Sequence, residues 1–429
     1  MQLALIVAAA LVVAFLSLPI ASTLGLLALV LDETFTSGRL SRTFGGFVWD
    51  NTTSFALLSI PLFILMGEIV LRGGIAERMY GAVSRWVSWL PGGLMHTNIG
   101  SCAMFAATSG SSVATAATVG TVAYGEIAAR RYNESLFLGS IAAGGTLGIL
   151  IPPSVVLIVY GVLTQTSIPE LYLAGIVPGL LLMGLYMAVI VAACLVRPAT
   201  GGIRVHTKWS ERIRALPDLA APLALFLGVV GSIYAGLATP TEAASIGVVV
   251  SLALVAARRR LNWAMLRGAF EGTVRTTAML MLIVIAAMLL NVVLGFIGVI
   301  QSATQYIGSL GLTPLATILI VVAFYFVLGM FMETFSMMLT TIGIVFPIVT
   351  AAGFDGVWFG IVVTLLMEVA LITPPIGLNL FVVHGIRERG GDFRDVCIGV
   401  LPFVAATLVL IGLMIAFPQI ALWLPRTFY

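Results

Sequence analysis

Long apolar runs separated by short basic segments organise the chain. A helix needs about 20 apolar residues to cross a bilayer, and the first run, 3–30, is too long for a signal peptide and lacks a basic leader. Similar runs predict further spans at about 53–71, 171–196, 219–236, 243–257 and 277–299, and a last span that ends at Phe417. Between them we expect a loop at 31–51 and amphipathic interfacial segments at 73–90 and 258–275.

Two other apolar runs contain strong helix breakers. Run 136–165 includes Pro152-Pro153, and run 357–385 includes Pro374-Pro375. Proline removes a backbone donor and clashes with the preceding turn, so each pair should break its helix. In hydrocarbon, the freed backbone groups are tolerated only where they are buried in protein or line an aqueous cavity. Each break therefore predicts an ion or substrate site.

The basic residues predict an orientation in the membrane. Of the 21 Lys and Arg residues, all but Arg39, Arg42 and Arg426 fall in five segments that the positive-inside rule assigns to the cytoplasm. These segments are 72–90, 128–134, 197–216, 258–275 and 386–395. The assignment requires 94–127 and 313–350 to be re-entrant hairpins that enter from opposite faces. It also predicts a cytoplasmic N-terminus and a C-terminus on the opposite side of the membrane.

The two halves of the chain repeat one order of parts: span, re-entrant hairpin, broken helix and final span. Because the predicted topology inverts the second copy, the pattern is typical of a transporter with a site near the bilayer midplane. The alternative is that helices rich in glycine and proline look alike by chance. We therefore predict an all-α polytopic membrane protein, an inverted-repeat transporter with two re-entrant hairpins and two Pro-Pro broken helices.

The amino-acid composition indicates a membrane protein and argues against several other classes of function. The chain is 60% hydrophobic and only 9% charged, whereas soluble proteins carry about 25% charged residues. A net charge of +3 is too small to indicate nucleic-acid binding. The three cysteines lie in apolar contexts, which argues against a disulfide framework or a metal cluster. Interfacial basic segments are expected to contact the lipid bilayer, and no cofactor is predicted.

The first hairpin tip is rich in small hydroxyl residues, from Ser109 to Ser112. Hydroxyls and freed carbonyls can replace the water around a sodium ion, although a small-residue packing seam would look the same. The half-helices after the two breaks are expected to begin at Ser154 and Ile376, with their positive dipole ends directed at a carboxylate. Asn379 could add a hydrogen bond. No Arg or Lys lies deep in a predicted span.

Two carboxylates lie deep in apolar runs. Glu333 belongs to the second hairpin tip and Glu368 precedes the second break. Acidic residues in a membrane are by default functional, and either could ligate an ion or titrate as a proton site. Capping of a half-helix is an equal alternative for Glu333. Glu68 and Glu242 lie near the ends of spans and are expected to be interfacial.

These motifs resemble the large membrane subunit of the tripartite ATP-independent periplasmic (TRAP) transporters, in the family's order along nearly the whole chain. The resembling stretches are 59–67, 109–112, 145–154, 239–244 and 373–381. The resemblance implies sodium-driven import of an organic acid, such as a C4-dicarboxylate or sialic acid, by an elevator movement in the bacterial inner membrane. It also implies two partners, a separate small membrane subunit and a periplasmic substrate-binding protein.

The resemblance further implies site residues. One sodium site would comprise Ser109, Ser111, Gly145, Gly148 and Pro152. The other would comprise Gly329, Ala370, Thr373 and Ile376, partly through backbone carbonyls. Ala370 stands where the family often has glycine, which puts the close packing there in doubt. The substrate would lie near Ser112, Ser154, Thr334, Ser336 and Asn379.

We further predict that the chain is divided into transport and scaffold parts. The transport parts are 94–170 and 313–385, and the scaffold parts are 1–93, 171–312 and 386–429. A stand-alone sodium/dicarboxylate or anion carrier of related architecture is the main alternative. An intramembrane hydrolase is disfavoured, because His96, His206 and His384 form no H-E-x-x-H motif and no evident pair with a serine, so no catalytic residue is assigned. The sequence contains no Walker A loop, so an ATP-driven permease is also disfavoured.

Overall fold

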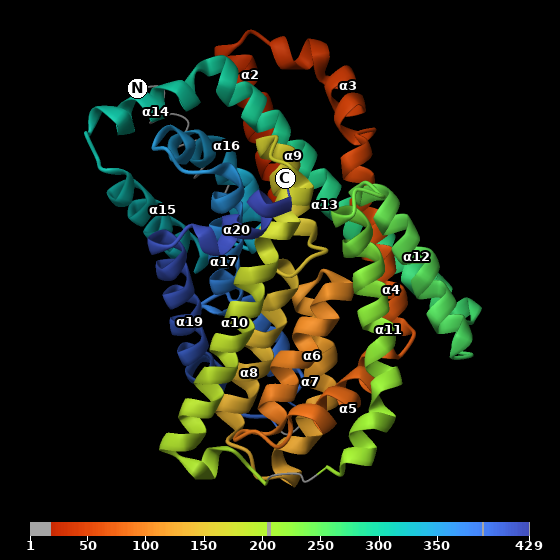
Figure 1. The fold of residues 1–429 in the computed structure, drawn as a ribbon. Helices are drawn as coiled ribbons and strands as arrows, with labels where there is room; N and C mark the ends of the chain where they lie inside the picture. The colour runs from red at the N-terminus through yellow and green to blue at the C-terminus, as the bar shows by residue number, and fades with distance from the viewer. Residues whose placement is uncertain (1–18, 204–206, 388–389, 429) are drawn as a thin grey trace.

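The computed structural model describes residues 19–203, 207–387 and 390–428, without the side chains of residues 39, 41 and 107–109. Nearly all of this part is helical (Figure 1). The helices are α2 (Ile20–Phe35), α3 (Arg39–Thr52), α4 (Phe55–Arg72), α5 (Ile75–Val87), α6 (Leu94–Ser109), α7 (Ser112–Ala129), α8 (Glu134–Thr146), α9 (Val155–Thr164), α10 (Ile168–Val196), α11 (Trp209–Tyr234), α12 (Pro240–Ala257), α13 (Trp263–Ile297), α14 (Val299–Ser309), α15 (Pro314–Gly329), α16 (Thr334–Ala351), α17 (Gly356–Ile372), α18 (Leu378–Gly385), α19 (Phe393–Ala416) and α20 (Gln419–Phe428).

Seven of the described helices are long and apolar enough to cross a membrane: α4, α10, α11, α12, α13, α16 and α19. Among the shorter apolar helices, α9 and α17 are largely buried, whereas α15 has many exposed residues. Within the described residues the β-structure is limited to one isolated bridge. The predicted all-α polytopic fold is confirmed.

Both predicted hairpins are present as pairs of helices, and their re-entry into the membrane stays a prediction. In the first, Gly110 ends α6 with a φ of 60°, a left-handed conformation that favours glycine, and Ser111 caps α7. In the second, α15 ends at Gly329, and Glu333 caps α16 by accepting hydrogen bonds from two backbone amides. The helices on either side of each tip are therefore separate, as the interrupted hydrophobic runs predict.

Both predicted breaks are present as well. After α8 the chain forms a short 3-10 turn and passes Pro152-Pro153, and Ser154 then caps α9. After α17 the chain passes Pro374-Pro375 before α18 begins at Leu378. The predicted start of this last helix at Ile376 is wrong by two residues. Ile376 lies in the turn instead, because the Gly377 amide closes that turn by donating to the Thr373 carbonyl oxygen at 3.1 Å.

Two other predictions need correction near the first span. Segment 31–51, predicted as a loop, contains α3, and α2 continues five residues beyond the predicted end at Val30. The buried Asp32 carboxylate accepts a hydrogen bond from the Leu40 amide at 3.0 Å, which holds the end of α2 against the start of α3. Residues 3–18 of the predicted first span lie outside the described residues.

The second interfacial segment is also different from its prediction. Segment 258–275 and the span predicted after it are largely one continuous helix, the 35-residue α13. The stretch has no proline, and its charged residues lie along the helix surface, where Arg267 and Glu271 pair at 2.7 Å across one turn. Charge alone therefore did not end the helix. The helices α14 and α20 were not predicted.

Contacts link the five basic segments to one another or to the start of α11. Asp218 pairs with Arg78 at 3.9 Å and with Arg258 at 3.6 Å. A β-bridge joins Tyr132 to Gly201, and Arg387 pairs with Glu134 at 2.8 Å. The grouping agrees with the predicted hairpin topology. That these segments face the cytoplasm stays a prediction.

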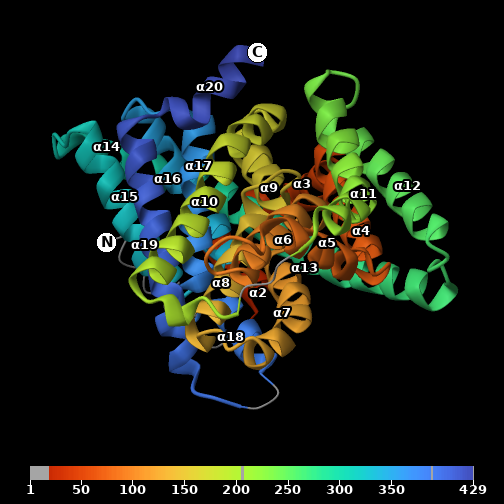
Figure 2. The same ribbon diagram turned by 60° about the horizontal axis from the view of Figure 1, so that its bottom comes forward.

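Helices α10 and α19 pack on the broken helices (Figures 1 and 2). The hydroxyls of Tyr186 on α10 and Thr407 on α19 lie 2.8 Å apart, and the indole of Trp358 on α17 donates to a carbonyl oxygen of α19. Gly139 of α8 lies so close to α19 that a Cβ there would be 2.1 Å from the Gly399 carbonyl oxygen. On the other side of the molecule, α4 packs against α12 and α13.

Candidate functional site

The first hairpin tip lies directly against the first break. The Ser112 hydroxyl donates to the Thr146 carbonyl oxygen at 3.4 Å. A Cβ on Gly148 would be 3.3 Å from the Ser111 carbonyl carbon, and one on Gly145 would be 3.2 Å from the Ser112 carbonyl oxygen. The two glycines thus allow the backbone of the break to approach the backbone of the tip.

The residues predicted for the first sodium site are therefore close together, as far as they are described. Ser111, Gly145 and Gly148 share this contact, and Pro152 lies in the adjoining turn. The side chain of Ser109 lies outside the described part of the structure; its backbone forms the end of α6.

The second hairpin lies against α17, just before the second break. A Cβ on Gly329 would be 2.6 Å from the Cβ of Ala370, so α15 approaches α17 as closely as a glycine permits. Because Gly329 supplies this space, the alanine at position 370 is compatible with close packing. The Thr373 hydroxyl donates to the Val369 carbonyl oxygen at 2.6 Å. Ile376 follows in the turn.

The donor atoms near both tips suit an alkali cation. Among the described residues, no group of three or more His, Cys, Asp or Glu side chains gathers as transition metals require. Hydroxyl and backbone carbonyl oxygens surround the tips instead, and such oxygens coordinate sodium at unwound helices of transporters. The two sodium sites stay a prediction that this chemistry fits.

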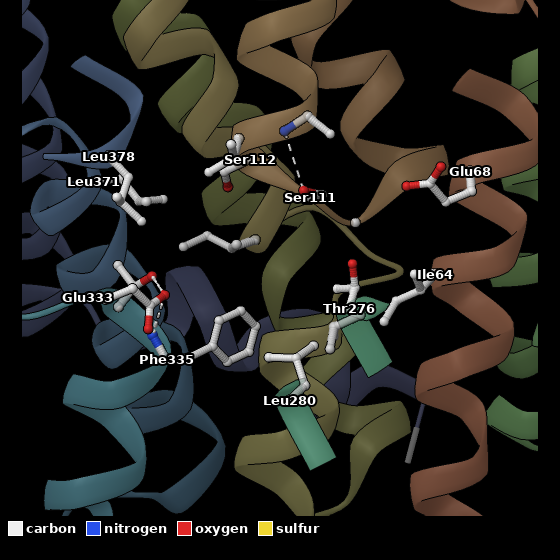
Figure 3. A pocket seen from close by; sticks show the side chains of 16 residues that line it. Ile64, Glu68, Ser111, Ser112, Thr276, Leu280, Glu333, Phe335, Leu371 and Leu378 are labelled. Atoms are coloured by element: carbon white, nitrogen blue, oxygen red, sulfur yellow. Dashed lines mark hydrogen bonds between the residues drawn. The ribbon is translucent and has the colours of Figure 1, made fainter. Parts of the chain in front are cut away.

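A cavity of about 140 Å³ lies between the two hairpin tips (Figure 3). One wall comes from residues 110–114 of the first hairpin and 333–335 of the second. The breaks and their flanking helices add Ile149, Val155, Leu371 and Leu378. The facing wall comes from α4 and α13, through Ile64, Glu68, Thr276 and Leu280.

A family model described as "Tripartite ATP-independent periplasmic transporter, DctM component" matches residues 4–420. The chain belongs to this TRAP transporter family. It is 35% identical over 383 residues to the C4-dicarboxylate TRAP transporter large permease protein DctM of Pseudomonas aeruginosa, with 88% of each chain covered. It is 32% identical to the sialic acid large permease protein SiaM of Vibrio cholerae, with 87% of each covered. It is 31% identical to the ectoine large permease protein TeaC of Halomonas elongata, with 86% of each covered.

The fold is also similar to a solved structure. The crystal structure of the Alcanivorax borkumensis YdaH transporter matches with a TM-score of 0.68 over 96% of this chain and 99% of that one. The sequence identity of 16% limits this likeness to the fold. The curated relatives are permease components of transporters, so this TRAP permease belongs to a family of transport proteins rather than enzymes.

The residues predicted to contact substrate divide into two groups. Ser112 and Thr334 line the cavity. Ser154, Ser336 and Asn379 are fully buried and bonded to their surroundings. The Ser154 hydroxyl donates to the Ile149 carbonyl oxygen, the Ser336 hydroxyl to Glu333, and the Asn379 amide nitrogen to the Ala142 carbonyl oxygen at 3.0 Å. These three shape the elements around the cavity and are absent from its lining.

The structure distinguishes the two deep carboxylates. Glu333 accepts hydrogen bonds from the amides of Phe335 and Ser336 at 3.1 and 3.0 Å and from the Ser336 hydroxyl at 2.9 Å. It therefore has the capping role among its predicted alternatives. Glu368 is fully buried, and within the described structure neither of its carboxyl oxygens accepts a hydrogen bond. The nearby Thr146 hydroxyl donates to the Ala143 carbonyl oxygen instead.

Sequence reasoning missed the wall contributed by α4 and α13. Glu68, predicted to be interfacial, lines the cavity and accepts a hydrogen bond from Arg72 Nε at 2.8 Å. A carboxylate one turn before an arginine in an apolar run was the available signal, because such a pair compensates a charge inside the membrane. Thr276 and Leu280 carry no comparable signal.

Proposed function

We propose that this chain is the large permease subunit of a sodium-driven TRAP transporter that imports an organic acid by an elevator mechanism. The observation that carries the proposal is the cavity bounded by both hairpin tips, both breaks and the facing wall of α4 and α13. A site between paired interrupted helices is where inverted-repeat transporters bind substrate and coupling ions. No catalytic residue or cofactor is required.

The substrate class rests on the chemistry of the cavity and of the relatives. The relatives are named for C4-dicarboxylates, sialic acid and ectoine, all of which carry a carboxylate. Helix α7 begins at the cavity, and backbone amides at a helix N-terminus favour an anion, whereas the first amides of α16 already donate to Glu333. Sodium at the two predicted sites would supply positive charge, because no Lys or Arg belongs to the lining.

For the elevator movement we propose a mobile body on the basis of packing. The sequence predicts that 94–170 and 313–385 move within a scaffold of 1–93, 171–312 and 386–429. The contacts of Tyr186 with Thr407 and of Trp358 with α19 support the inclusion of α10 and α19 in the mobile body. Helices α4, α11, α12 and α13 would then form the fixed scaffold.

The partners and the location follow from the family. A tripartite transporter of this kind works with a small membrane subunit and a periplasmic substrate-binding protein. We propose that this chain lies in the bacterial inner membrane with its basic segments in the cytoplasm. Its N-terminus would be cytoplasmic and its C-terminus periplasmic.

The test is uptake by the reconstituted complex of all three components. We expect accumulation of a labelled organic acid that the binding protein carries, only with an inward sodium gradient, and its loss when a sodium ionophore collapses that gradient. Uptake driven by protons without sodium would overturn the sodium coupling. Full activity without any binding protein would favour a stand-alone anion carrier of related architecture.

A further inference from the structure

The cavity has an acidic lining, although the proposed substrate is an anion. Its lining includes two carboxylates, Glu68 and Glu333, and no Lys, Arg or His. Figure 3 shows these two residues on opposite sides, Glu68 on α4 and Glu333 at the second hairpin tip. A carboxylate substrate entering this cavity meets like charge unless a cation is bound nearby.

The two carboxylates are held in different ways. Glu333 is bound by backbone amides and hydroxyls of its own helix end. Glu68 instead pairs with Arg72, one turn along α4 and outside the cavity lining. The Glu68 side chain is 20% exposed and the Arg72 side chain 42%. Arg72 therefore offsets only part of the Glu68 charge as the cavity experiences it, since it lies farther away and nearer to solvent.

Two glycines of α13 leave the space that this ion pair occupies. A Cβ on Gly272 would be 2.8 Å from the Glu68 carboxyl carbon, and one on Gly268 would be 2.7 Å from Arg72 Nη1. The glycines are four residues apart and so lie on one face of the helix. The pair thus occupies the seam between α4 and α13, and any larger residue at either position would displace a charged group.

We propose that Glu68 is a charge filter that makes anion binding in the cavity depend on bound sodium. Without sodium, Glu68 and Glu333 disfavour a carboxylate; bound sodium compensates them, and the anion then enters. This inference rests on the proposed sodium-driven uptake. In this proposal the Glu68 carboxylate sets the negative potential in the cavity. The Arg72 guanidinium neutralises part of it.

The proposal predicts opposite effects for the two partners of one ion pair. Glu68→Gln removes the negative charge and leaves Arg72 unpaired, so the half-saturating sodium concentration for uptake should fall about tenfold and sodium-free uptake should appear. Arg72→Gln leaves Glu68 uncompensated, so the half-saturating sodium concentration should rise. Both would be measured in proteoliposomes that contain the complete transporter, by titrating sodium at a fixed substrate concentration.

A second ion pair with the same spacing is the matched control. Arg267 and Glu271 lie on α13, 71% and 63% exposed, and neither lines the cavity. Glu271→Gln and Arg267→Gln should leave the sodium titration unchanged. The double variant Glu68→Gln/Arg72→Gln contains no unpaired charge, which protects its folding, and its half-saturating sodium concentration should lie below that of the wild type.

The experiment distinguishes failure of the proposed function from failure of the charge filter. If wild-type uptake needs no sodium, the proposed function fails before the variants are compared. If wild-type uptake needs sodium and both single variants shift the sodium requirement in the same direction, the filter is overturned and the pair is structural. A double variant with a sodium requirement at or above that of the wild type would also overturn it.

Discussion

The two halves of the repeat follow the same backbone route with different chemistry. In the first half, a serine hydroxyl caps each helix that starts at the site: Ser111 caps α7 and Ser154 caps α9. In the second half, the Glu333 carboxylate caps α16, and Gly377, before α18, provides no side-chain cap. Among the four helix starts at the tips and breaks, a negatively charged cap therefore occurs in the second half only.

This difference shows that helix capping does not require a charged residue at these positions. Either serine or glutamate satisfies the free amides at a helix start, so capping alone does not explain a partly buried carboxylate near an anion site. The second half also contains Glu368, which accepts no hydrogen bond in the described structure. We infer that, at the hairpin tips, the second half carries a charge that a bound cation must compensate, whereas the first half offers neutral oxygens.

The strongest test exchanges the cap of the second hairpin for that of the first. Glu333→Ser keeps a good capping residue, so the free energy of unfolding should change by less than about 1 kcal/mol. The half-saturating sodium concentration for uptake should nevertheless fall at least tenfold, because one of the two carboxylates that disfavour the anion is lost from the cavity. Sodium-driven uptake and thermal unfolding in detergent would be measured together. A wild-type sodium requirement would show that the charge difference between the halves has no role in transport.

A second test compares the two predicted sodium sites. Ser111→Ala and Thr373→Ala should each raise the half-saturating sodium concentration, by roughly fivefold, since each removes one hydroxyl near a predicted site. Ser111→Ala should also lower the melting temperature, because the Ser111 hydroxyl accepts from the Ala114 amide at the start of α7. Unchanged sodium activation in both variants would remove the site assignment from both halves.

The smallest effects are expected at the two breaks. Ser154→Ala removes the cap of α9 and should destabilise the protein by about 1 kcal/mol. Gly377→Ser would place a capping side chain at the corresponding point of the second break. A Cβ there would be 2.8 Å from Leu380 Cδ1, so this change should also destabilise the protein. Calorimetry in detergent would measure the loss of stability of each variant. A stabilising Gly377→Ser would contradict the described turn.

Local chemistry explains which parts of the fold were predictable. Proline pairs and glycine-rich tips act on their own turn of helix, so both breaks and both hairpins could be located from residues 144–154, 373–379, 109–112 and 329–336. The boundary of α13 could not, because charged residues within a helix are compatible with its continuation where the helix surface leaves them exposed. Capping by Asp32 at the α2–α3 corner depends on an amide eight residues away, which no local pattern identifies.

The sequence by itself determined the membrane class, both interrupted helices and the family, because hydrophobicity, proline and motif order act locally or are read in order along the chain. Only the tertiary structure decided which side chains meet at the cavity. Ser112 and Thr334 reach it, while Ser154, Ser336 and Asn379 turn into the protein. Glu68 and Thr276 reach it from α4 and α13, since helix packing brings together residues that are far apart in the chain.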